Sequence, residues 1–129
     1  MKKADLTDAE WKVMKIVWEL ETCSARDVYT IGGERYEWAP TTVKTYLSFL
    51  VNKGYLSAKK KGNSFIYKPK RSLISTLQRA GDHLLEKTLD GADGPLLAYL
   101  VKRSQLSKAD LTEIRQVLDE HEKRHSAEE

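Results

Sequence analysis

The spacing of apolar residues changes abruptly at Gly54, and this change limits the folds that the chain can adopt. Up to Gly54, apolar side chains recur every three or four residues, which predicts helices over about residues 8–21, 24–31 and 40–53. Beyond it, apolar and polar residues alternate, which predicts strands at 55–59 and 65–68 around a basic turn at 60–64. Three helices followed by a hairpin, over about residues 5–70, is the order of a winged helix-turn-helix.

Short motifs predict where these helices begin and end. Thr7 and Glu10 form a capping box, in which each side chain can bond the backbone amide of the other residue at a helix start. Pro40 suits the first turn of the third helix, where no amide hydrogen is needed. Gly32 and Gly33 predict the end of the second helix, which is therefore expected to be short.

The chain beyond residue 71 has another composition and is expected to be helical. Helices are predicted at about 72–90, from Pro95 and from Ser107, with leucines on one side. Such short helices bury too little apolar surface alone, and a second copy of the chain is the simplest partner. The expected fold class is thus mostly α with a small β-hairpin. Two domains are expected, a winged-helix DNA-binding domain at 1–71 and a helical dimerisation domain at 72–129. The expected dimerisation residues are Leu77, Leu84, Leu85, Leu89, Leu96, Leu97, Leu100, Leu111, Ile114 and Leu118.

Charge is distributed unevenly along the sequence. The 44 positions between Glu37 and Asp82 hold nine lysines and arginines and no acidic residue. Residues 1–71 hold 14 basic and 8 acidic side chains, a net charge of +6, and residues 72–129 hold 8 and 11, a net charge of −3. Because a solvated surface normally mixes both signs, the basic stretch indicates a polyanionic partner, and nucleic acid fits better than a membrane surface.

The third predicted helix is the expected reader of double-stranded DNA. With its apolar stripe in the core, it presents hydroxyl side chains and one lysine, which suit base edges and phosphates. The alternative, an ordinary polar helix surface, would usually also carry glutamate. The expected DNA-binding residues of this helix are Thr41, Thr42, Lys44, Thr45 and Ser48.

The tip of the hairpin is the expected wing. Lysines on a loop suit phosphates, which position a protein on DNA without reading its sequence. Protection of a strand edge would explain one lysine more readily than three. The aromatic residues Tyr55, Phe65 and Tyr67 are expected to face the core rather than to stack on single-stranded nucleic acid. The expected DNA contacts of the wing are Lys59, Lys60, Lys61 and Asn63.

No catalytic constellation is recognised, and the chain is not expected to be an enzyme. His121 and His125 match the His-Glu-x-x-His pattern of zinc proteases, but a third ligand and a substrate cleft are missing. The single cysteine, Cys23, excludes a disulfide framework and is expected to be structural. No apolar run is long enough to cross a membrane. A cytoplasmic protein without metal, cofactor or membrane insertion is expected.

Several segments resemble the penicillinase-repressor family of bacteria, which includes methicillin-resistance and copper-operon repressors. The resemblance covers nearly the whole chain and is strongest at residues 6–14, 16–18, 38–45 and 53–56. It implies a homodimeric winged-helix transcriptional repressor that binds a two-fold symmetric operator, with the tail forming the dimer. It also implies that Trp38 and the third-helix residues belong to the recognition region.

Two departures from the family concern the inducing signal. The Cys-x-Cys motifs of copper-responsive members are absent, so copper sensing is not expected. β-Lactam-responsive members are inactivated by proteolysis at an Asn-Phe bond, and the aligned bond here is Tyr99–Leu100. The resemblance thus implies a membrane sensor protease as a partner, in a chain that lacks the asparagine. The alternative function is a winged-helix protein–protein interaction module without sequence-specific DNA binding.

Overall fold

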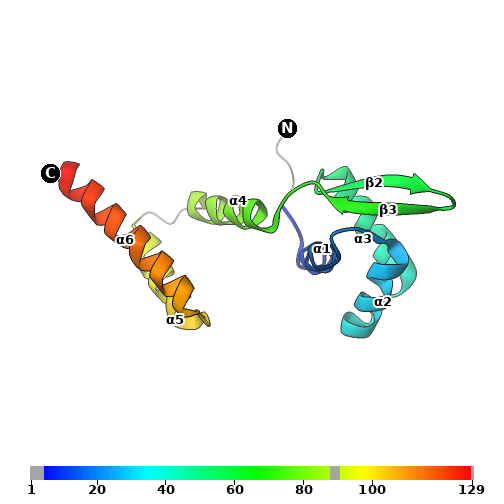
Figure 1. The fold of residues 1–129 in the computed structure, drawn as a ribbon, viewed down its shortest axis with the longest axis horizontal. Helices are drawn as coiled ribbons and strands as arrows, with labels where there is room; N and C mark the ends of the chain where they lie inside the picture. The colour runs from blue at the N-terminus through cyan, green and yellow to red at the C-terminus, as the bar shows by residue number, and fades with distance from the viewer. Residues whose placement is uncertain (1–4, 88–90, 129) are drawn as a thin grey trace. The chain divides into compact units, whose positions relative to one another are not determined.

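The computed structural model describes residues 5–87 and 91–128. In chain order, the elements labelled in Figure 1 are α1 (Asp8–Leu20), β1 (Cys23–Ser24), α2 (Ala25–Tyr36), α3 (Pro40–Asn52), β2 (Leu56–Lys61), β3 (Ser64–Pro69), α4 (Leu73–Glu86), α5 (Asp93–Arg103) and α6 (Lys108–Glu128). The chain divides into two compact units, Met1–Leu84 and Leu85–Glu129. The predicted boundary between residues 71 and 72 lies just before α4, whereas most of α4 packs with the first unit. That residues 1–71 bind DNA and residues 72–129 form the dimer stays a prediction.

The first unit is a small helical core on an antiparallel sheet, and it confirms the predicted fold class. The sheet has the strand order β1-β3-β2. One face of each of α1, α2 and α3 and the start of β2 build the core. Its fully buried side chains include Val13, Met14, Ile16, Val17, Val28, Val43, Leu47, Leu50, Tyr55 and Leu56.

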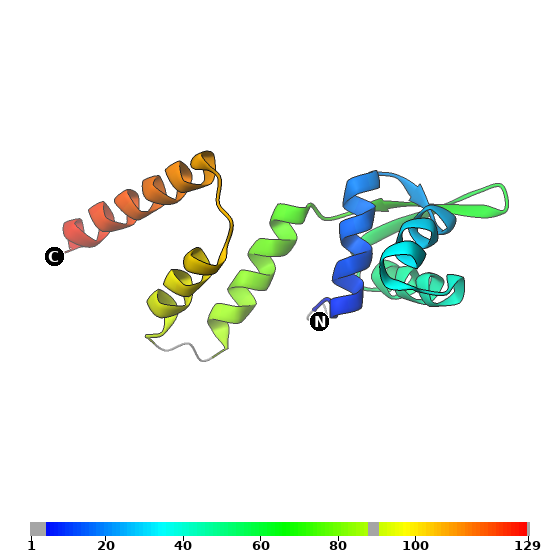
Figure 2. The same cartoon turned by 90° about the horizontal axis from the view of Figure 1, so that it is seen from below.

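The hairpin is longer and its turn tighter than predicted. Lys61 pairs with Ser64, so that only Gly62 and Asn63 form the turn. Gly62 has a φ of 63°, in the left-handed region that such two-residue turns require. Lys60 and Lys61 therefore lie on a strand rather than in a basic loop. Both views show the hairpin extending past the helices (Figures 1 and 2).

The hairpin sheet differs from the prediction in two further ways. A third strand, β1, pairs Cys23 with Tyr67 and was not predicted. Phe65 was expected in the core but is 48% exposed. It lies opposite Lys60, one pair from the end of the ladder, where the hairpin has passed the helices. Tyr67, two residues further on, does pack against the core, and Tyr55 is buried as expected.

Helix α2 continues through Gly32 and Gly33 to Tyr36, so the prediction that these glycines end it is wrong. Their function is close packing. A Cβ atom at residue 32 would lie 2.6 Å from Cε3 of Trp38, closer than real side chains approach. The helix instead ends at Glu37, in the left-handed conformation with φ 58°. Gly32 thus allows the Trp38 ring to lie directly on the backbone of α2.

Replacing Gly32 with alanine is expected to lower the free energy of unfolding by about 1–3 kcal/mol, because the Trp38 ring must shift. The helix propensity that alanine gains over glycine, about 1 kcal/mol, offsets part of this cost. Gly33→Ala is the matched control, since its Cβ would lie 3.3 Å from Cε1 of the Tyr29 side chain, which can give way. Urea unfolding followed by tryptophan fluorescence measures both variants. Equal stability of the two would contradict the role given to Gly32.

The second unit has little core of its own. Helix α6 begins with Ser107 and Asp110 bonded to each other's amides at 3.0 and 3.1 Å, as the sequence predicts. No side chain of residues 91–127 is buried. Leu97 and Leu118 are 57% and 61% exposed. The predicted dimerisation residue Leu89 lies outside the described residues.

Candidate nucleic-acid interface

Helix α3 separates an apolar face from a face of hydroxyl groups. Val43, Leu47 and Leu50 are buried. The predicted DNA-binding residues lie on the other side: Thr41, Lys44, Thr45 and Ser48 are exposed and Thr42 is half-buried. The Thr45 hydroxyl donates to the Thr41 carbonyl at 3.0 Å, which leaves its oxygen lone pairs and its methyl group for a partner.

The N-terminus of α3 is open to an anion. Ala39 is the N-cap residue and provides no side-chain acceptor for the first amides, and the first turn contains no acidic residue. The first turn of α3 therefore places no carboxylate of its own at the positive end of the helix dipole. Such a terminus favours a phosphate.

Phe49 is a candidate contact that sequence reasoning did not single out. It lies on α3 and is 50% exposed. Because it follows Thr45 by four residues, it belongs to the same side of the helix. Its position outside the apolar stripe at 43, 47 and 50 was the signal that could have identified it.

Trp38 positions the start of α3 instead of lying free on its surface. Its ring lies over Gly32 and contacts two tyrosines, with centroids 4.8 Å from Tyr36 and 5.4 Å from Tyr46. Tyr46 is on α3 and Tyr36 ends α2. The aromatic cluster thus holds α2 and α3 together near the point where α3 begins.

The wing lysines lie on two opposite faces of the hairpin. All four predicted wing residues, Lys59, Lys60, Lys61 and Asn63, are exposed. Side chains alternate along a strand, so Lys59 and Lys61 share one face and Lys60 the other. Lys60 lies opposite Phe65, on the face that continues into the core through Tyr67. Lys59 lies opposite Ile66, on the outer face of the sheet.

Lys53 belongs to the basic stretch but is engaged inside the fold. Its Nζ donates to Glu10 Oε1 at 2.6 Å and to the Asp5 carbonyl at 3.1 Å. The Glu10 side chain is 2% exposed and also accepts from the Thr7 amide at 2.8 Å. Burial alone would raise the pKa of Glu10, but the hydrogen bonds from Lys53 and Thr7, with the charge of Lys53, hold it below its usual 4.5. Lys53 therefore joins the end of α3 to the start of α1.

Arg71 is a second basic residue with an internal role. Its guanidinium lies over the Tyr55 ring, 5.6 Å from the centroid, and its carbonyl accepts from Trp18 Nε1 at 2.9 Å. These contacts fix the chain between β3 and α4. Within the basic stretch, the exposed cations are therefore Lys44 of α3, the lysines of the hairpin and Lys70.

The other chemical candidates of the sequence are one thiol and two histidines. Cys23 is buried, and burial together with the charge of Asp27 raises the pKa of its thiol to about 11, so the thiol stays protonated near neutral pH. His121 and His125 lie on α6. Among the described residues, no group of three or more histidine, cysteine, aspartate and glutamate side chains could hold a metal ion. No helix within residues 5–87 and 91–128 is long and apolar enough to span a membrane.

Three helices on a small antiparallel sheet, with an exposed third helix beside a lysine-bearing hairpin, define a winged helix-turn-helix protein. The chain belongs to the family described as Penicillinase repressor, which it matches over residues 6–120. This confirms the resemblance seen in the sequence. The family is one of repressors and not a class of enzymes.

Individual relatives agree with this assignment. The penicillinase repressor of Bacillus licheniformis is 29% identical over 125 residues, covering 96% of this chain and 98% of the relative. An uncharacterized 16.5 kDa protein of Latilactobacillus sakei is 32% identical over 114 residues, covering 88% of this chain and 78% of the relative. The solution structure of the DNA-binding domain of the repressor BlaI is 32% identical, with a TM-score of 0.52, and the match covers 56% of this chain and 88% of that domain.

Proposed function

We propose that the protein is a bacterial transcriptional repressor that binds a two-fold symmetric DNA operator as a homodimer and acts in the cytoplasm. In this proposal α3 enters the major groove and the β2-β3 hairpin contacts phosphates. Occupation of the operator by the dimer excludes transcription. The proposed DNA contacts are Thr41, Thr42, Lys44, Thr45, Ser48, Lys59, Lys60, Lys61 and Asn63.

The observation that carries this proposal is that α3 and the hairpin expose cations and hydroxyls and contain no carboxylate. Both α3 and the hairpin come from the 44 residues that hold no acidic side chain. Within the described parts of the chain, no ion pair engages Lys44 or the three wing lysines. A protein-interaction surface would be expected to mix charges, whereas a polyanion binds a surface of one sign.

Replacing Lys59, Lys60 and Lys61 together with alanine is expected to weaken binding to all DNA sequences alike. It should also reduce the slope of log K against log salt by up to about 2.7, because each neutralised phosphate contributes about 0.9. Thr42→Ala should instead relax sequence preference and keep the slope, since base contacts specify and phosphate contacts position. The operator is first identified by sequencing the DNA fragments that the protein retains, and anisotropy titrations then compare it with a scrambled duplex.

Two outcomes of these titrations would contradict the assignment. An unchanged salt slope in the triple variant would remove the hairpin from the interface. Binding to protein partners that depends neither on salt concentration nor on added DNA would favour the alternative function, a winged-helix protein–protein interaction module. Because the lysines lie on two faces of the hairpin, the salt slopes of two variants can be compared. One is the double variant Lys59→Ala/Lys61→Ala, and the other is Lys60→Ala. The variant with the larger change in slope identifies the face that lies on the phosphates.

Exposed apolar side chains of α4, α5 and α6 support the homodimer in this proposal. No residue of 91–127 is buried, so their leucine faces need a partner, and a second copy provides matching ones. Leu77, Leu97 and Leu118 are 49%, 57% and 61% exposed. The proposed contact residues are Leu77, Leu84, Leu85, Leu96, Leu97, Leu100, Leu111, Ile114 and Leu118.

Relief of repression is proposed to follow cleavage at Tyr99–Leu100 by a membrane sensor protease. Both side chains are exposed, but the bond lies inside α5. Backbone hydrogen bonds on both sides hold it, so cutting requires α5 to open locally first. In producing cells exposed to a cell-wall antibiotic, the intact 14.8 kDa chain is expected to give way to a fragment ending at Tyr99. Derepression with the chain fully intact would show that the signal acts by another route.

A further inference from the structure

Both phenylalanines of the chain lie half-exposed on the two elements proposed to contact DNA. Phe49 belongs to α3 and is 50% exposed, and Phe65 belongs to β3 of the hairpin and is 48% exposed. Single exposed apolar residues are common on protein surfaces, and what distinguishes Phe49 is its position. It is a large apolar side chain on the helix that is proposed to read base edges.

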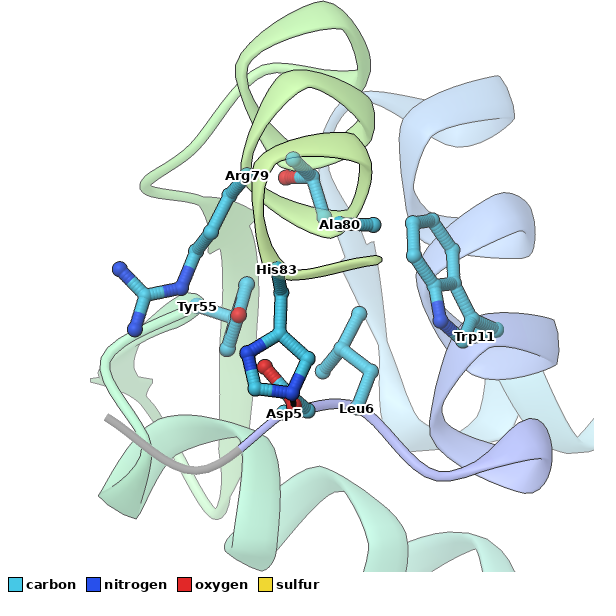
Figure 3. A pocket seen from close by; sticks show the side chains of 8 residues that line it. Asp5, Leu6, Trp11, Tyr55, Arg79, Ala80 and His83 are labelled. Atoms are coloured by element: carbon cyan, nitrogen blue, oxygen red, sulfur yellow. Dashed lines mark ion pairs between the residues drawn. The ribbon is translucent and has the colours of Figure 1, made fainter. Parts of the chain in front are cut away.

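Aromatic side chains elsewhere in the first unit are used in packing. Figure 3 shows Trp11 and Tyr55 among the side chains that line a small pocket beside α4, and Tyr55 is 2% exposed. The Trp38 ring packs on α2 and α3, as described above. Among the described residues, by contrast, no aromatic ring stacks on Phe49. Half of its side chain is left for a partner outside the fold.

Phe49 adjoins the threonines of the proposed recognition face. It follows Thr45 by one helical turn and Thr42 by two, which places the three residues on one side of α3. Long side chains of a helix lean toward its N-terminus, so the ring covers the turn at Thr45 rather than the end of the helix. The Thr45 hydroxyl donates to the Thr41 carbonyl at 3.0 Å, which leaves the Thr45 methyl group for a partner. Phe49 and Thr45 thus form an apolar area within a face of hydroxyl groups.

The chemistry of the major groove identifies the group that this apolar area can contact. The base edges there present hydrogen-bond donors, acceptors and one kind of apolar group, the 5-methyl group of thymine. We propose that Phe49 contacts a thymine methyl group in each half of the operator and thereby contributes to sequence specificity. This role rests on the proposed function, in which α3 enters the major groove. It adds an apolar contact to the hydrogen bonds that hydroxyl groups and Lys44 can make.

Replacing single thymines of the operator with deoxyuridine tests this proposal, because the two bases differ only in the 5-methyl group. At one position of the half-site, the replacement should lower the affinity of the full chain by about fourfold for each half-site changed, the factor that corresponds to burying one methyl group. With Phe49→Ala, the affinities for the two duplexes at that position should become equal. Anisotropy titrations measure both affinities. Their ratio is taken within one variant, so that a general loss of binding or stability cancels.

Two further variants separate contact with the methyl group from other effects. Phe49→Leu keeps an apolar side chain and should keep part of the deoxyuridine effect. Phe65→Ala removes the phenylalanine of the hairpin and should leave the deoxyuridine effect unchanged at every position.

Three outcomes would contradict the role of Phe49. Sequence-specific binding that is indifferent to every thymine methyl group would overturn it, and so would a deoxyuridine effect that Phe49→Ala leaves unchanged at every position. In both cases the proposed function would stand. Absence of sequence-specific binding to any duplex would overturn the proposed function, and the role of Phe49 with it.

Discussion

A chain that ends at Lys87 is expected to bind a complete two-fold operator about 100- to 10,000-fold more weakly than the full protein. It keeps the contacts of the Met1–Leu84 unit, including α3 and the hairpin, and loses α5 and α6. The loss is one of avidity, because two half-site readers joined in a dimer bind the second half-site at a high effective concentration. Affinity for a duplex with a single half-site should not change. Sedimentation and anisotropy titrations measure the two effects.

A shorter chain that ends at Arg71 separates dimerisation from stability. It should lose operator affinity to the same extent as the chain ending at Lys87. It should also have a lower Tm, since it lacks Thr76, which is 3% exposed, and the rest of α4 that packs on the first unit. A chain ending at Lys87 that still sediments as a tight dimer would show that the dimer does not require α5 and α6. Undiminished operator affinity of either fragment would contradict the avidity argument.

Replacing Lys53 with methionine is expected to lower the free energy of unfolding by about 3 kcal/mol near pH 7, because it leaves a buried carboxylate without its cation. Glu10 is 2% exposed and would keep only the Thr7 amide among its present donors. The loss would also affect two elements, since the ion pair joins the end of α3 to the start of α1. Urea unfolding at several pH values measures it.

The effect of Lys53→Met should depend on pH in a defined direction. Folding lowers the pKa of Glu10 below 4.5, so the pair stabilises the folded state at pH values above the unfolded pKa. This contribution disappears as the pH falls through the folded pKa. The difference between wild type and variant should therefore be complete near pH 7 and shrink below about pH 4.5.

Two controls separate the ion pair from general effects of removing a lysine. Lys15→Met changes an exposed lysine of α1 and should alter stability by no more than about 0.5 kcal/mol. Glu10→Gln added to Lys53→Met should recover part of the loss, because the buried group is then neutral and can still accept from Thr7. Equal free energies of unfolding for Lys53→Met and Lys15→Met would show that the Lys53–Glu10 ion pair makes no net contribution to stability.

Features that depend on neighbours in the sequence could be predicted well. The Thr7–Glu10 capping box forms as expected, with amide-to-side-chain distances of 2.8 and 3.2 Å. The buried and exposed sides of α3 also follow from helical spacing, because Val43, Leu47 and Leu50 share one stripe. The prediction that the hydroxyl-bearing face of α3 is exposed was therefore correct. Its contacts with DNA stay predictions.

Features that depend on distant partners could not be predicted in the same way. Gly32 resembles a helix terminator until the Trp38 ring is seen on it. The two residues of β1 form a strand only because Tyr67 and Ile66 lie beside them, more than 40 positions later. Lys53 resembles one more cation for DNA, but Glu10 engages it from 43 positions earlier. Each of these outcomes follows from tertiary packing, which local patterns do not encode.

The lysines of the hairpin also act on the free protein. Lys59, Lys60 and Lys61 are consecutive on β2, and Lys68 lies on the adjacent strand, with no carboxylate on either strand to offset them. Like charges held this close repel one another, and dissolved ions screen the repulsion over distances of about 10 Å at 0.1 M. Added salt therefore relieves a strain in the unbound hairpin while it weakens attraction to a polyanion. Salt thus acts in opposite directions on the free hairpin and on its proposed complex with DNA, and Lys59, Lys60 and Lys61 take part in both effects.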